Sequence, residues 1–141
     1  MLRKGRKALV VLATMGALLA VFAAPASAAT GGGCTTYSAS HSHICVSWVT
    51  GVGMEPNYFL DAFGPVTSTG YSEVFLTYCY TGQACQSPLL WRDRTTHLGL
   101  YPNRVPVKPP ASSHGQAWAN VYFYTSGGAL TGGGISPTQY W

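Results

Sequence analysis

The sequence predicts an all-β fold: a single small antiparallel β-sandwich of the immunoglobulin-like kind, with about six or seven strands and two disulfides. Short runs of β-branched and aromatic residues alternate with polar residues, and Gly, Pro, Ser and Thr separate these runs. No window combines the three-to-four spacing of apolar residues with the caps that a helix requires. The chain has four cysteines, an even number that is typical of paired, exported thiols.

Residues 1–28 are predicted to be a signal peptide. Four basic side chains between residues 3 and 7 precede an apolar run from Ala8 to Ala24, and Ala26-Ser27-Ala28 fits the small-x-small cleavage pattern. An uncleaved anchor is the alternative, but the apolar run is at the short end of what spans a membrane. We therefore expect the mature protein to be secreted and extracellular, and not to be attached to a membrane.

Without this segment the chain has no formal net charge. The formal net charge of +4 lies entirely within it, because the rest of the chain carries equal numbers of basic and acidic side chains. Nucleic acids and anionic membrane surfaces require a basic patch, and the mature chain has none in its sequence. We expect neither as a partner.

The central element is expected to be a strand from Tyr71 to Tyr80, the longest β-type run without Gly or Pro. A period of two places Val74 and Leu76 on one bulky face, which should point to the core, and Phe75 on the other face. Further strands are expected at 44–49, 58–63, 89–91, 96–101 and 117–125.

The remaining segments are expected to be connections. Residues 29–43 are predicted to be a flexible lead, so that the sandwich domain comprises 44–141. Residues 102–115 contain four prolines and are expected to form an extended connection that crosses from one sheet to the other. The tail is rich in glycine.

Two local disulfides are preferred, Cys34–Cys45 and Cys79–Cys85. Gly82 lets the chain double back between the second pair, and a polar run separates the first pair. Each such ring is worth about 2–3 kcal/mol in the chain-entropy account. A long-range bridge from Cys45 to Cys79 is the alternative.

Three segments carry a resemblance: Cys45-Val-Ser-Trp-Val-Thr-Gly-Val-Gly53, Asn57-Tyr-Phe-Leu-Asp61 and Gly115-Gln-Ala-Trp-Ala-Asn120. With the Ala-rich leader, they resemble small exported β-rich proteins of actinomycetes. That resemblance implies an exported β-sandwich and no particular chemistry.

Aromatic residues give the main candidate binding site. In 117–125 one strand face is small and apolar, and the other carries Trp118, Asn120, Tyr122 and Tyr124. If this second face meets solvent, its flat amphipathic side chains can stack on sugar rings or anchor a protein. The sequence leaves open the alternative that the large aromatics fill the core.

A second candidate contact is Trp91 with Arg92 and Arg94, residue types that often anchor interfaces. An internal Arg–Asp pair beside a packed tryptophan explains the same residues.

Catalytic and metal-binding patterns are incomplete. His41 and His43 could share a strand face, but a metal would need a third ligand. The order His43, Asp61, Ser126 matches a serine-protease triad, although no Gly-x-Ser-x-Gly elbow is present and that fold needs two barrels. We expect no enzyme, no metal and no cofactor.

These observations favour a monomeric, secreted, non-enzymatic binding domain. Its expected partner is an extracellular glycan, cell-envelope material or a protein, contacted through exposed aromatics. The alternative is an extracellular inhibitor of a secreted hydrolase, a protease or an amylase. That alternative would use the Cys79–Cys85 ring or the loop 102–115, which carries Arg104 and Lys108.

Overall fold

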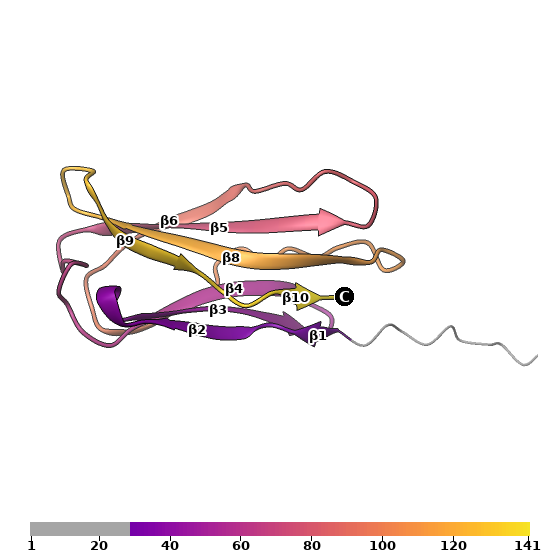
Figure 1. The fold of residues 1–141 in the computed structure, drawn as a ribbon, viewed down its shortest axis with the longest axis horizontal. Helices are drawn as coiled ribbons and strands as arrows, with labels where there is room; N and C mark the ends of the chain where they lie inside the picture. Colours follow the sequence, from indigo (N-terminus) through magenta and orange to yellow (C-terminus); the bar gives the residue numbers. More distant parts are fainter. Residues whose placement is uncertain (1–28) are drawn as a thin grey trace, which may run out of the picture.

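The computed structural model describes residues 29–141, so the predicted signal peptide lies outside the described residues. Ten strands and one short 3-10 turn form two antiparallel sheets, which Figure 1 shows as two layers. The predicted fold class, an all-β antiparallel sandwich with two disulfides, is confirmed. The expectation of six or seven strands is corrected to ten.

The larger sheet, called sheet A here, has the order β1-β10-β8-β5-β6, and β9 also pairs with β8. Its strands are β1 (Thr30–Gly31), β5 (Tyr71–Tyr80), β6 (Leu89–Arg94), β8 (Gly115–Tyr124), β9 (Leu130–Ile135) and β10 (Gln139–Tyr140). Strands β10 and β9 pair with the beginning and the end of the same side of β8, and β1 pairs with the outer side of β10.

The smaller sheet, sheet B, has the order β2-β3-β4-β7. Its strands are β2 (Gly33–Tyr37), β3 (Ser42–Val49), β4 (Gly53–Leu60) and β7 (Gly99–Tyr101), and the turn η1 (Ser38–Ser40) joins β2 to β3. The Pro-rich connection leads from β7 in sheet B to β8 in sheet A, the crossing that the sequence predicts.

Strand β5 has the predicted bounds and the predicted faces. It lies between β6 and β8, and Val74 and Leu76 on its inner face are fully buried. Val46 of β3 and Phe123 of β8 are also fully buried, so the core lies between the two sheets as expected.

Tyr58 of β4 joins the two sheets at the centre of the core. Its ring stacks on Tyr101 with 4.5 Å between centroids and meets Phe123 edge-on at 5.4 Å. Its hydroxyl is hydrogen-bonded to the hydroxyl of Ser72 on β5, at 2.8 Å. Burial raises the pKa of the Tyr58 hydroxyl far above its ordinary value, so this group stays protonated and can donate.

The expected flexible lead, 29–43, instead carries β1, η1, β2 and the start of β3. The chain passes from sheet A to sheet B at Gly32, whose N–H donates to the carbonyl of Thr138 at 2.8 Å. Gly31 and Gly32 both have positive φ and lie so close to Thr138, Gln139 and Val46 that a Cβ would collide. These glycines therefore serve close backbone approach rather than flexibility.

The Gly-rich tail forms β9 and β10, which the sequence analysis missed. The ring of Tyr37, which comes from sheet B, lies directly over Gly134. The Tyr37 hydroxyl donates to the carbonyl of Ile135 at 2.8 Å and accepts from its N–H at 2.7 Å. The Tyr37 hydroxyl thus hydrogen-bonds both the C=O and the N–H of Ile135 on the edge strand β9, and it links the two sheets.

Strand β4 begins at Gly53, earlier than the expected residue 58, although it contains Pro56. Met54 exchanges backbone hydrogen bonds with Val107, and Tyr58 pairs with Tyr101. Pro56 lies between these two pairs, and its backbone nitrogen points away from β3. Its missing N–H therefore removes no hydrogen bond from the ladder between β3 and β4. On that side the neighbouring strand, β7, pairs only with Tyr58, Phe59 and Leu60, so Pro56 has no strand partner there that would need its N–H.

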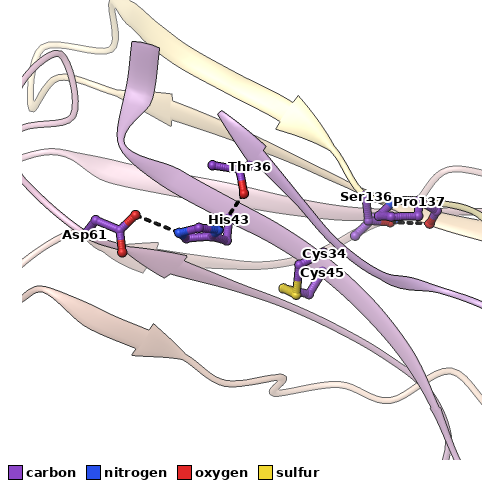
Figure 2. Close-up of a disulfide and its surroundings, with 8 residues drawn as sticks. Cys34, Thr36, His43, Cys45, Asp61, Ser136 and Pro137 are labelled. Carbon is purple, nitrogen blue, oxygen red and sulfur yellow. Dashed lines mark hydrogen bonds and ion pairs between the residues drawn. A yellow bond between two sulfur atoms is a disulfide. The ribbon is translucent and has the colours of Figure 1, made fainter. Parts of the chain in front are cut away.

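Both disulfides have the local pairing that was preferred, and the Cys45–Cys79 alternative is wrong. Cys34 and Cys45 lie directly opposite each other on β2 and β3, as Figure 2 shows. Cys79 closes the second ring with Cys85 just after the end of β5. Neither bridge joins the two sheets, so the sandwich is held by its core and by inter-sheet hydrogen bonds.

Removing the hydroxyl of Tyr58 should leave the buried Ser72 hydroxyl with only its long hydrogen bond to the carbonyl of Asp93, at 3.5 Å. We expect Tyr58→Phe and Ser72→Ala each to lower the free energy of unfolding by about 1–3 kcal/mol. The double variant should lose about 1 kcal/mol less than the sum, because its second change removes a group that has already lost its hydrogen bond to the other. Urea unfolding with the disulfides intact measures this. Tyr78→Phe, which removes an exposed hydroxyl bonded to Gln86, is the matched control and should change little. Strict additivity of the first pair would contradict the proposed coupling.

Gly134→Ala should destabilise the protein by about 1–3 kcal/mol, because the added methyl overlaps the Tyr37 ring. Gly127→Ala is the control, since its Cβ would meet only Thr125 Oγ1 at 3.8 Å. Thermal unfolding monitored by circular dichroism compares the two variants. Equal stability would show that Tyr37 does not pack against β9.

Candidate functional site

The row Trp118, Asn120, Tyr122 and Tyr124 lies on the outer face of sheet A. The alternate residues of β8 are the ones that point inward: Ala117, Ala119, Val121 and Phe123 are all fully buried. Tyr122 is 38% exposed, and Trp118 and Tyr124 are half-buried. The alternative in which these aromatics fill the core is therefore wrong.

Strand β5 adds two rings that the sequence analysis did not assign to the site. Tyr71 stacks on Tyr124 with 4.9 Å between centroids, and Phe75 meets Tyr122 edge-on at 5.8 Å. Both residues alternate with the buried residues of β5, and this alternation could have placed them on the outer face from the sequence alone. We call the resulting surface the aromatic face; it comprises Tyr71, Phe75, Trp118, Tyr122 and Tyr124.

One end of the aromatic face is internally packed. The guanidinium of Arg92 lies 5.0 Å from the centre of the Tyr71 ring, on the same outer face, and forms an ion pair with Glu73. Partial burial, together with the Glu73 carboxylate, raises the pKa of the Tyr124 hydroxyl, which is therefore a hydrogen-bond donor at neutral pH. Arg92, Tyr71 and Tyr124 are thus packed against one another, and the two rings are half-buried.

The other end has rings with a polar group between them. Asn120, only 7% exposed, donates from Nδ2 to Thr77 Oγ1 at 2.8 Å, and Thr77 is hydrogen-bonded to Ser87 at 2.8 Å. Trp118 and Tyr122 flank this amide and are about 13 Å apart along the strand, given the rise per residue. An extended ligand could contact both rings at once.

The residues of the second candidate contact, Trp91, Arg92 and Arg94, lie on opposite faces of β6. Trp91 lies opposite Val74 on the inner face and is only 8% exposed, so its assignment as a binding residue is wrong. Strand alternation is the physical reason, because it sends every second residue of β6 to the core. Arg92 and Arg94 point outward and are exposed.

The three residues of the triad pattern are not all brought together. Figure 2 shows His43 between two partners: Nε2 lies 2.6 Å from Asp61 Oδ2 and Nδ1 lies 2.9 Å from Thr36 Oγ1. Ser126 is in the turn between β8 and β9 and forms no hydrogen bond with either residue.

The candidate metal pair, His41 and His43, is also separated. His41 adopts a left-handed conformation at the end of η1, so it does not share a strand face with His43. Within residues 29–141, no group of three or more His, Cys, Asp or Glu side chains could hold a metal ion.

The two basic residues of the Pro-rich connection are engaged within the protein. Arg104 donates to Asp93 Oδ2 from Nε at 3.0 Å and from Nη2 at 2.7 Å. Lys108 donates to the carbonyl of Gly51 at 3.0 Å. In the Cys79–Cys85 ring, by contrast, residues 81–85 are all exposed.

Comparisons with protein-family models, with curated proteins and with solved structures find no match to this chain. Across the described residues, 29–141, none of the helical structure is long and apolar enough to cross a membrane. The two disulfides are compatible with an extracellular protein.

Proposed function

We propose that this protein is a secreted, non-enzymatic domain that binds an extracellular or cell-envelope glycan through the aromatic face. The observation that carries the proposal is the orientation of β8, in which Trp118, Tyr122 and Tyr124 face outward while the alternate residues are buried. Large aromatic side chains normally contribute to core burial, so an outward row of them on two neighbouring strands indicates a binding surface.

A glycan suits the composition of this face. Flat rings can contact the apolar C–H surfaces of sugars, and the interleaved amide, hydroxyl, carboxylate and guanidinium groups can bond to sugar hydroxyls. Trp118 and Tyr122 are the proposed stacking residues, since Tyr71 and Tyr124 already cover each other. Asn120, between the two stacking residues, keeps its carbonyl oxygen as an acceptor.

Secretion is supported by the leader pattern in 1–28 and by the paired cysteines. A domain exported in this way would meet cell-envelope and environmental polysaccharides. The described part of the chain carries little net charge, so its affinity would depend on stacking and hydrogen bonding rather than on long-range attraction.

An inhibitor of an extracellular hydrolase is the second candidate. It is favoured by one observation, the small disulfide ring from Cys79 to Cys85 with its exposed loop. Arg104 and Lys108 are held by intramolecular bonds and would have to be released before entering a protease pocket. The aromatic face therefore supports the glycan proposal better than the loops support inhibition.

Trp118→Ala and Tyr122→Ala should each weaken binding to the recognised polysaccharide by about tenfold or more, because each removes a stacking ring. Phe59→Ala is the matched control: Phe59 is 38% exposed, like Tyr122, but lies on sheet B. Pull-down with insoluble cell-wall polysaccharides and affinity electrophoresis with soluble ones provide the measurement.

Binding that is equally weakened by Phe59→Ala would remove the aromatic face from the proposal. Failure of the unmodified protein to bind any polysaccharide tested would sink the glycan assignment. Inhibition of trypsin, subtilisin or α-amylase by the same preparation would then favour the second candidate.

A further inference from the structure

A groove of about 810 Å³ lies at the end of the sandwich where β3 ends and β8 begins. In Figure 1 this is the end at which β10 and the label C lie. One wall is the β3–β4 hairpin and the other is the segment 108–114 of the Pro-rich connection. We call it the end groove; it is formed by a different part of the molecule from the aromatic face.

Aromatic rings line the floor of the end groove. Trp48 and Trp141 both line it and stack with 6.4 Å between centroids and 15° between planes. Tyr80 meets the far side of this pair, edge-on to Trp141 at 5.9 Å. Trp48 is only half-buried, so part of its ring remains available to a ligand.

Both walls of the end groove are fixed. Lys108 donates to the carbonyl of Gly51 at 3.0 Å, which ties the connection to the hairpin. The carbonyl of His114 accepts from the N–H of Thr81 at 2.9 Å, and Trp141 Nε1 donates to Ser113 Oγ at 3.2 Å. Two adjacent prolines stiffen the backbone between these contacts. A site built in this way loses little entropy on binding because it is already ordered.

Gln139 supplies a fixed polar group in the lining. It is 97% buried, with only 3% exposed, and its Nε2 donates to the carbonyls of Thr30 and Tyr140, both at 2.9 Å. These two bonds set the orientation of the amide. Among the described residues none donates to Oε1, which leaves this acceptor for a ligand hydroxyl.

The ionisable side chains of the lining are both of basic types. Lys108 and His114 are its only ionisable side chains, and the lining includes no Asp or Glu. Lys108 uses one donor on Gly51 and keeps two. Hydroxyl groups complete the lining, from Ser47, Thr50 and Ser113.

We propose that the end groove binds an acidic sugar, a sugar unit that carries a carboxylate. The C–H face of its ring would lie on Trp48, one hydroxyl would donate to Gln139 Oε1, and the carboxylate would lie at Lys108 and His114. The inference rests on the proposed function for the class of ligand, a glycan. It names a second subsite and the charge of the sugar that this subsite takes.

The test is a titration of the ¹⁵N-labelled protein with D-glucuronate, followed by the indole N–H signals in NMR spectra. The signals of Trp48 and Trp141 should shift and saturate, whereas that of Trp118 should stay in place. D-glucose should bind at least about tenfold more weakly, since it lacks the charge. Benzoate should also bind more weakly, because it has a carboxylate but no hydroxyl for Gln139.

Lys108→Gln should weaken glucuronate binding by about tenfold, and Lys108→Arg should retain most of it. Lys108 is exposed, so both variants are expected to fold, and an unchanged NMR spectrum outside the end groove checks this. His114→Gln is the second variant and should also weaken binding. Full affinity in Lys108→Gln, or benzoate binding as tightly as glucuronate, would overturn the proposal.

The experiments distinguish the proposal for the aromatic face from the proposal for the end groove. Trp118→Ala should leave glucuronate binding unchanged, and its loss in that variant would place the sugar on the aromatic face and overturn the end groove. Saturable shifts of Trp48 without any polysaccharide binding would support the end groove and count against the aromatic face. No shift of Trp48 or Trp141 with glucuronate would overturn the end groove alone.

Discussion

The packing of Tyr58 across the core joins the two sheets of the sandwich. Its ring, stacked on Tyr101, projects from sheet B toward β8 and occupies space between the sheets. On β8 the Tyr58 ring meets Phe123, and further along the same inner face Ala117 and Ala119 are also fully buried. Because strand faces alternate, the other aromatic residues of β8 face outward. The side of β8 that packs into the core thus decides which of its residues form the aromatic face.

The sequence was sufficient to predict the class of fold, the bounds of β5, the two faces of β8 and both disulfides. Alternation divides a strand into two faces, but it does not say which one is buried, because that depends on how the strand packs against residues elsewhere in the chain. The four strands β1, β2, β9 and β10 were missed for a related reason. Glycine looked like a flexibility signal at Gly32 and Gly134, where the structure uses it for close contact.

The candidate sites were predictable to different degrees. Period two was enough to collect Trp118 and Tyr122 on one face, and the same period in β6 would have excluded Trp91 had the strand's inner face been known. The end groove could not be predicted from the sequence. Its lining joins Trp48 to Gln139 and Trp141, which are distant in the chain and are brought together by the pairing of β10 with β8 and the packing of the sheets.

The most direct test of the aromatic face is hydroxyl-radical footprinting of the free and the polysaccharide-bound protein. In the free protein, Trp118 and Tyr122 should be oxidised readily and Phe123 should be protected, as their positions on opposite faces of β8 require. Bound polysaccharide should protect Trp118 and Tyr122 while leaving Phe59 on sheet B as reactive as before. Protection of Phe59 with no change at Trp118 and Tyr122 would contradict the account.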